Sequence, residues 1–310
     1  MKIVALAGGV GGAKMVDGFA QILNHKDLSV IVNTADDFIH FGLYISPDLD
    51  TVCYTLSKLA NSITGWGREN ESWSVLEQLK QLGAPTWFNL GDKDLATHIE
   101  RTRRILLGEK LSTITKDFLT RWGCDISVFP MSDEKISTMI RTIEGKTIPF
   151  QEYFVKYQFQ PVIKNIYFEG INSAMAASGV IKSIDESDVI VICPSNPFVS
   201  IDPILRTPGI IKSIKEKKVV AISPIIEGRA VKGPAAKMSI EMGIKPCATS
   251  IALHYQNLLA GFILDNRDKN EMNDIFRCGI ITKAFDIVMS NRVDRKKLAQ
   301  NVLNFIEKEL

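Results

Sequence analysis

Four glycines and a lysine lie within seven residues near the start of the chain, in the run Gly8-Gly9-Val10-Gly11-Gly12-Ala13-Lys14. Glycine lets the backbone approach a phosphate closely, and the free N–H groups at the start of a helix add donors and positive potential. The run is not a Walker A loop, because no Ser or Thr follows Lys14, and Lys14 also stands where a dinucleotide fingerprint needs its third glycine. A tight turn without a ligand is the alternative, but it needs fewer glycines. We therefore expect these glycines and Lys14 to bind phosphate groups.

Three groups of carboxylates lie where apolar runs end or helices begin. Their aspartates are Asp36 and Asp37, Asp48 and Asp50, and Asp92 and Asp94. An aspartate in front of a helix is most often an N-cap, and this is the simple alternative for Asp50. Three such groups near one edge of a sheet suit a hard cation such as Mg²⁺ bound together with phosphates. Aspartates alone do not identify the metal.

A third polar segment is Cys193-Pro194-Ser195-Asn196-Pro197, which follows another apolar run. In an open α/β sheet, the loops at the carboxyl ends of the strands form the ligand crevice. Ser195 and Asn196 could donate to a phosphate or read the edge of a base. A proline-flanked Ser-Asn pair is also an ordinary turn, so the segment is a weak signal by itself.

The elements that must position these residues alternate along the chain. Short, largely β-branched runs indicate strands buried on both faces of a parallel sheet, at Ile3–Ala7, Leu28–Val32, Val189–Cys193 and Val219–Ile222. Helical spacing occurs between them, at Ala13–Leu23, Asn172–Ile184, Pro208–Lys215 and Pro234–Met242. The alternation predicts an α/β fold with a Rossmann-like, doubly wound and mostly parallel sheet.

The middle of the chain has a different pattern. Helical spacing comes first, at Ser74–Leu82, Asp94–Leu107 and Thr113–Arg121, and strand-like stretches follow at Ser137–Ile143 and Val162–Phe168. Residues 61–169 are therefore expected to form an inserted helical and small-sheet region, in a core built from residues 1–60 and 170–310. The last predicted helix is Asp294–Lys308, with Asp294 as its N-cap.

Composition narrows the class of protein. The chain has 310 residues with 37 Lys and Arg against 35 Asp and Glu, a net charge of +2, which is far from the basic excess of a nucleic-acid binder. The basic cluster Arg101-Thr102-Arg103-Arg104 is expected on a solvated helix face. No apolar run is long enough to span a membrane. The five cysteines are scattered, which fits a cytoplasmic protein and argues against a disulfide framework or a zinc site.

Some catalytic patterns are absent. The four histidines, His25, His40, His98 and His254, have no metal-ligand spacing, and a structural role is the simpler reading for each. No G-x-S-x-G elbow of an α/β-hydrolase occurs. The four tryptophans lie in or beside residues 61–169, where they are expected to pack a core or to form the wall of a pocket for a flat ring.

Taken together, the motifs resemble the 2-phospho-L-lactate transferase family, and they run in the family's order along nearly the whole chain. They are the glycine run, Asp36-Asp37, Pro47-Asp48-Leu49-Asp50-Thr51, Gly65-Trp66-Gly67, Leu90-Gly91-Asp92-Lys93-Asp94-Leu95-Ala96-Thr97-His98 and Pro194-Ser195-Asn196-Pro197. Each motif is weak alone, but the ordered set is specific.

The resemblance implies a transferase of coenzyme F420 biosynthesis. Such an enzyme moves 2-phospho-L-lactate from lactyl-2-diphospho-5'-guanosine to 7,8-didemethyl-8-hydroxy-5-deazariboflavin, releases GMP, requires Mg²⁺ and is commonly a homodimer. Some members use a phosphoenolpyruvyl donor, and the sequence leaves the donor acid open. The resemblance implies that Asp50 and Asn89 contact the deazaflavin, with Thr51, Gly91, Asp92 and Lys93 beside them. It also implies that the glycine loop holds the diphosphate and that Ser195 and Asn196 lie on the nucleotide side.

Two roles of Asp50 stay open at this point. It could hold Mg²⁺ against the diphosphate, or it could orient or deprotonate the attacking hydroxyl. A related branch of the superfamily binds nucleotide sugars and regulates metabolism without established catalysis, and such a regulatory protein is the alternative function. An NAD-type dehydrogenase is a third hypothesis, disfavoured because the fingerprint fails at Lys14.

Overall fold

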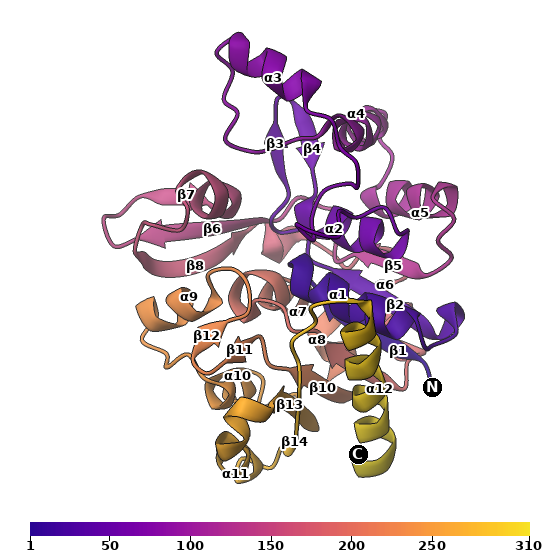
Figure 1. Cartoon of the computed structure of the whole chain (residues 1–310), viewed down its shortest axis with the longest axis vertical. Coiled ribbons are helices and arrows are strands. Elements are labelled where there is room, and N and C mark those ends of the chain that lie inside the picture. Colours follow the sequence, from indigo (N-terminus) through magenta and orange to yellow (C-terminus); the bar gives the residue numbers. More distant parts are fainter.

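The computed structural model describes all 310 residues, and its centre is a seven-stranded parallel sheet (Figure 1). The strands run in the order β14-β13-β10-β9-β1-β2-β5, and every neighbouring pair is parallel. Their bounds are β1 Ile3–Ala7, β2 Leu28–Val32, β5 Ser127–Pro130, β9 Val189–Ile192, β10 Lys218–Ile222, β13 Gly261–Asp265 and β14 Ile281–Phe285. The predicted Rossmann-like α/β fold is confirmed.

Helices cover both faces of this sheet because successive residues of the buried strands point to opposite sides. Ala5 and Val191 pack into one core with α1 Gly9–Ala20, α2 Pro47–Leu56, α5 Leu111–Arg121 and α12 Arg292–Glu309. Leu6 and Ile192 pack into the other with α6 Val180–Asp185, α7 Asp202–Arg206, α8 Ile210–Ile214, α10 Ala248–His254 and α11 Met272–Phe276. The central strands β1 and β9 are therefore apolar and buried at every position, as the sequence indicated.

Residues 61–169 divide into three parts. First come α3 Ser74–Gln81 and α4 Asp92–Leu106 beside α5, and then the edge strand β5 of the main sheet. A separate antiparallel sheet follows, made of β6 Ser137–Thr142, β7 Thr147–Pro149 and β8 Ile163–Glu169, which projects on the left of Figure 1. The range expected as an insertion thus contains one strand of the core sheet, because β5 pairs with β2 from Ser29 to Val32.

Short elements complete the chain. The hairpin of β3 Phe38–His40 and β4 Leu43–Ile45 stands at the top of Figure 1 with α3. The others are β11 Ile225–Ile226, β12 Arg229–Ala230, α9 Ala235–Glu241, 3₁₀ turns at His25–Asp27, Ile171–Ser173 and Asn266–Glu271, and π turns at Glu152–Lys156 and Pro197–Ile201. No helix in the structure combines the length and the apolar character that a bilayer crossing requires.

Several helix boundaries differ from the sequence prediction; α1, for example, runs from Gly9 to Ala20 where Ala13–Leu23 was expected. The helix expected from Asn172 begins only at Val180, because Gly179 takes a left-handed φ of 92° that breaks the run. The last helix begins at Arg292 with Asn291, not Asp294, as its N-cap. Asp294 is the third helical residue and accepts from the Asn291 amide, so the two form a capping box.

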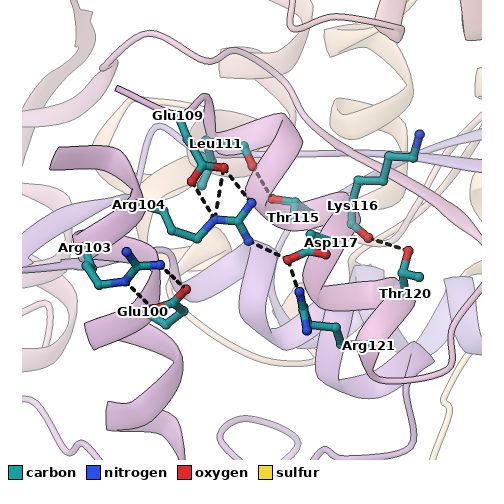
Figure 2. Close-up of polar contacts among 10 residues, drawn as sticks. All are labelled: Glu100, Arg103, Arg104, Glu109, Leu111, Thr115, Lys116, Asp117, Thr120 and Arg121. Carbon is teal, nitrogen blue, oxygen red and sulfur yellow. Dashed lines mark hydrogen bonds and ion pairs between the residues drawn. The ribbon is translucent and has the colours of Figure 1, made fainter. Parts of the chain in front are cut away.

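Ion pairs fasten α4 to α5 (Figure 2). The Arg104 guanidinium lies between Glu109 and Asp117, donating to each at 2.6 Å, and Asp117 also accepts from Arg121 at 2.9 Å. Arg104 is largely buried, whereas Arg103 of the same predicted cluster is exposed and pairs with Glu100. The network matters for the site because α4 carries several of its side chains.

Candidate active site

A cavity of about 720 Å³ lies at the carboxyl edge of the sheet beside β1 and β9. Strand order reverses between these two strands, since β2 and β5 lie to one side of β1 and the later strands to the other. Ligands of open α/β sheets bind at such a switch point. The loops that follow the two strands touch there, because a Cβ added to Gly11 would lie 2.3 Å from the carbonyl oxygen of Pro194.

The glycine loop forms the floor of this cavity at the start of α1. Gly8 is the N-cap residue and has no side chain, so it provides no acceptor of its own for the first amides of the helix. Gly9 follows with a left-handed φ of 61°, which favours glycine. Gly8, Gly9, Gly11 and Lys14 line the cavity. Gly12 instead packs against the β9 loop, where an added Cβ would lie 2.7 Å from Ser195 Oγ.

Ser195 and Asn196 line the cavity but have partners within the protein. The Ser195 hydroxyl donates to the Gly8 carbonyl at 2.8 Å and accepts from the Gly8 amide at 3.1 Å. Asn196 caps the turn after β9 by accepting from Phe198 N at 3.0 Å, and its amide points to Met238 Sδ. Ser195 therefore ties the β9 loop to the glycine loop, whereas Asn196 closes the turn after β9. Their predicted contact with the nucleotide would have to be made alongside these bonds.

Asp36 and Asp48 form an acidic wall next to the glycine loop. Asn33 Nδ2 donates to Asp48 Oδ2 at 3.0 Å, and Asp48 also accepts from the Gly9 amide. Burial raises the pKa of Asp48 to about 6, and burial together with the charge of Asp48 raises the pKa of Asp36 well above its usual value. Oδ1 of Asp36 is buried without a hydrogen-bond partner. This pair therefore lacks a counter-cation within the chain.

Asp50 is not an N-cap, contrary to the simple alternative. Ser46 precedes α2 and Asp50 is its fourth residue, so its side chain turns inward instead of closing the helix end. Both carboxylate oxygens accept from the guanidinium of Arg101, Oδ2 at 3.0 Å, and both residues are buried. The negative charge of Asp50 raises the pKa of Arg101 despite the opposing effect of burial. The expectation that Arg101 lies on a solvated helix face is wrong.

Asp94 and His98 lie beside this pair. With Arg101 they occupy one face of α4 at spacings of four and three residues. His98 Nδ1 is 3.7 Å from Asp50 Oδ2, His98 Nε2 is 3.3 Å from Asp94 Oδ1, and the Tyr54 hydroxyl donates to Asp94 at 2.6 Å. His98 and Arg101 were missed as site residues. The Asp-x₃-His-x₂-Arg spacing was the only local signal for these residues. It indicates a site only when the face of α4 that carries them is known to be buried.

The remaining predicted substrate residues separate into two sets. Thr51 and Asn89 line the cavity beside Asp50. The cavity is not lined by Gly91, Asp92 or Lys93, because their segment instead binds the loop before α3 to the start of α4. Asp92 accepts from Ser72, Ser74 and Val75, Lys93 donates to the carbonyls of Glu69 and Asn70, and Gly91 packs on the Glu71 carboxyl group.

Aromatic side chains form the outer walls. Phe150 and Phe154 stack with ring centroids 5.7 Å apart, and Phe154 stacks on Phe159 at 6.1 Å. Trp66 is the one tryptophan that lines the cavity, and Phe88 lies next to Asn89. Flat faces above a polar floor suit a ligand with a planar ring and a phosphorylated chain.

Fold and site together define a Rossmann-like α/β protein with a cavity suited to phosphorylated ligands. Residues 3–309 match the family described as "2-phospho-L-lactate transferase CofD", and the chain belongs to this family. The family resemblance is therefore confirmed.

Relatives with two different names align over nearly the full chain. A "Phosphoenolpyruvate transferase" of Streptomyces griseus is 40% identical and covers 99% of both chains. A "2-phospho-L-lactate transferase" of Methanosarcina acetivorans is 35% identical over 98% of this chain and 99% of its own. A solved structure of a UPF0052 family protein from Bacillus halodurans matches with a TM-score of 0.63 and 16% identity, covering 97% of this chain and 98% of the other, which shows the shared fold.

Proposed function

We propose that this protein is a transferase of coenzyme F420 biosynthesis. It moves 2-phospho-L-lactate from lactyl-2-diphospho-5'-guanosine to 7,8-didemethyl-8-hydroxy-5-deazariboflavin and releases GMP. Family membership and the archaeal relatives support this activity. The structural observation that carries it is one cavity combining a glycine loop, a carboxylate wall and stacked aromatic rings. Diphosphate donor and ring-bearing acceptor would meet there.

Mg²⁺ fits the acidic wall better than it fits Asp50. Asp36 and Asp48 offer hard oxygen ligands beside the glycine loop, and neither forms an ion pair, while burial raises the pKa of both carboxyls. Asp50, Asp94 and His98 also have ligand atoms within 4.8 Å of one another, but Arg101 already neutralises Asp50. We therefore assign Mg²⁺ to Asp36 and Asp48 in place of the expected Asp50. Bound there, the ion would neutralise diphosphate oxygens.

Asp50 then acts by positioning. Arg101 fixes its carboxylate, which keeps lone pairs free for one more donor, and the ribityl hydroxyl of the acceptor is that donor. The hydroxyl oxygen bonds to the phosphorus that bears the lactyl group, the bond to the GMP phosphate breaks, GMP leaves with the electron pair, and the hydroxyl proton is released to water. Amides of the glycine loop and Lys14 stabilise the charge on the phosphate oxygens.

The deciding experiment incubates the protein with the deazaflavin, Mg²⁺ and one guanosine donor at a time, and measures GMP and the new deazaflavin product by chromatography. The phospholactyl donor is expected to release GMP. The phosphoenolpyruvyl donor is the necessary second arm, because relatives named phosphoenolpyruvate transferase are 37–40% identical to this chain. If neither donor releases GMP while a nucleotide sugar raises the melting temperature, the protein is a regulatory binder.

Two further properties belong to this proposal. We expect a homodimer, to be measured by light scattering, and a cytoplasmic location, to be measured by fractionation.

A further inference from the structure

Lys232 lines the cavity, and none of the motifs above includes it. It belongs to the loop between β12 and α9, where Val231, Lys232, Gly233 and Pro234 all line the cavity. Its ammonium donates to the carbonyl oxygen of Thr64 at 2.9 Å. Since these residues are 168 positions apart in the chain, this bond joins two loops from different parts of the fold.

The bond brings the ammonium close to the glycine loop. Thr64 precedes Gly65, which has a left-handed φ of 74° and packs directly on Val10. A Cβ added to Gly65 would lie 2.8 Å from Val10 Cγ1 and 3.9 Å from Lys232 Nζ. The lysine therefore ends above the same turn that offers its amides to a ligand. This packing explains the first glycine of the Gly65-Trp66-Gly67 segment, since only glycine fits between Lys232 and Val10.

Lys14 and Lys232 carry positive charges that no carboxylate of the chain neutralises. Lys14 Nζ donates to the Met289 carbonyl at 2.8 Å, and neither lysine forms an ion pair. Partial burial lowers the pKa of both amines, and the charges of Arg295 and then of Lys232 lower the pKa of Lys14 further, against a smaller opposing effect of Asp294. Each ammonium has three N–H donors, and a single carbonyl accepts from each. Two unneutralised cations on one cavity leave donors for an anion.

We propose that Lys232 is a second phosphate-binding lysine, which together with Lys14 holds the diphosphate of a nucleotide ligand over the glycine loop. This inference rests on the proposed function in one respect only, the identity of the nucleotide. Any ligand with a diphosphate would meet the same two ammonium groups. In the proposed reaction, negative charge accumulates on the GMP phosphate as its bond to the second phosphorus breaks, and an ammonium at this position stabilises that charge.

The test compares Lys232→Met with the parent by calorimetry, using GDP, guanosine and inorganic pyrophosphate as separate probes. Methionine keeps the length of the stem and removes the charge. GDP and pyrophosphate are expected to bind at least ~10-fold more weakly, because a charge-assisted contact to phosphate is lost. Guanosine, which has no phosphate, is expected to bind unchanged. Lys232→Arg should restore part of the loss.

Lys245→Met is the matched control, since Lys245 is exposed, lies outside the cavity and has no side-chain partner. Its GDP affinity should equal that of the parent. Unchanged binding of GDP and pyrophosphate by Lys232→Met would overturn the proposal, as would an equal loss for guanosine. The pyrophosphate measurement tests the role of Lys232 independently of the proposed transferase activity. If the parent binds pyrophosphate through Lys232 but releases no GMP from either donor, the role of Lys232 is supported and the proposed function fails.

Discussion

At the scale of single residues, Asp50 lines the cavity and is also the counter-ion of a buried arginine. Asp50→Asn keeps the shape of the side chain but removes the negative charge that compensates Arg101. We expect turnover to fall at least ~100-fold, because the acceptor hydroxyl loses its fixed partner. We also expect the free energy of unfolding to fall by about 1–3 kcal/mol, because a buried charge loses its ion pair. GMP release and urea unfolding measure the two effects.

Asp185→Asn is the control for this substitution, since Asp185 is exposed and its side chain has no partner. It should change neither quantity. An Asp50→Asn variant that turns over within about threefold of the parent would remove Asp50 from the reaction.

The acidic wall leads to a prediction about pH and Mg²⁺. The pKa of Asp48 is raised to about 6 and that of Asp36 is raised well above its usual value, so both carboxyls bind protons better in the folded protein than in the unfolded chain. Their contribution to stability is therefore present at low pH and is lost as the pH rises through about 6. Mg²⁺ should raise the melting temperature more at about pH 7.5 than at about pH 5, and at 100 times its dissociation constant it adds about 2.7 kcal/mol.

Thermal denaturation in EDTA and in Mg²⁺ measures this difference. Asp36→Asn should raise the melting temperature of the metal-free protein at about pH 7.5 and remove most of the response to Mg²⁺. A variant that responds to Mg²⁺ like the parent would show that the ion binds elsewhere, and the same test on Asp94→Asn then examines the second ligand group.

At the scale of elements, the site depends on how closely α1 approaches the loop after β9. Gly11→Ala places a methyl group 2.3 Å from the Pro194 carbonyl oxygen, so the two segments must separate. We expect the free energy of unfolding to fall by about 1–3 kcal/mol and GDP binding to be lost. Gly83→Ala is the comparison for GDP binding, because nothing lies within 4 Å of its added Cβ, while its left-handed φ of 77° strains the alanine and lowers stability by itself. It should retain GDP binding, and equal binding by both variants would contradict the role of this contact.

The elements also show how far the sequence could be interpreted. Strands such as Ile3–Ala7 were predictable because a strand buried on both faces is a continuous apolar run. The edge strand β14, Ile281–Phe285, was missed because it includes Thr282 and Lys283 and is only partly buried, so no apolar run marks it. The short β5 ends in a proline and follows a helix, and its place in the main sheet depends on pairing with β2.

The same reasoning separates the predictable half of the site from the rest. The glycine loop and Asp48 follow from the rule that ligands lie at the carboxyl ends of parallel strands. Arg101 and His98 could not be found in this way, because they reach Asp50 only through the packing of α4 against α2 and β4. That arrangement is fixed by contacts such as Tyr44 N donating to Thr102 Oγ1 at 2.7 Å, which no local pattern encodes.

At the scale of the whole molecule, the two sides of the cavity come from different segments of the chain. The glycine loop, the β9 loop and Lys232 supply the proposed nucleotide contacts, whereas the proposed acceptor residues Asp50 and Asn89 belong to α2 and to the segment before α4. Nucleotide binding should therefore not require the acceptor. We expect GDP at 100 times its dissociation constant to stabilise the protein by about 2.7 kcal/mol with or without the deazaflavin.

Melting curves with GDP and UDP test this expectation and the base preference together. Stronger stabilisation by GDP would support a guanine contact near Ser195 and Asn196. Equal stabilisation would show that neither residue selects the base, in agreement with the protein partners that both side chains have. Dependence of GDP binding on the deazaflavin would contradict the separation of the two sides.

The position of β1 between β2 and β9 also determines when the site can form during synthesis. β1 is made before the other strands of this sheet, yet its neighbour β9 begins at Val189, so one edge of β1 stays unpaired until the chain has been made as far as β9. Such long-range pairing slows folding and exposes apolar strand edges to other chains. The glycine loop at the end of β1 is therefore translated long before Pro194 and Ser195, and because it needs both against it, it reaches its working shape only after β9 has been made.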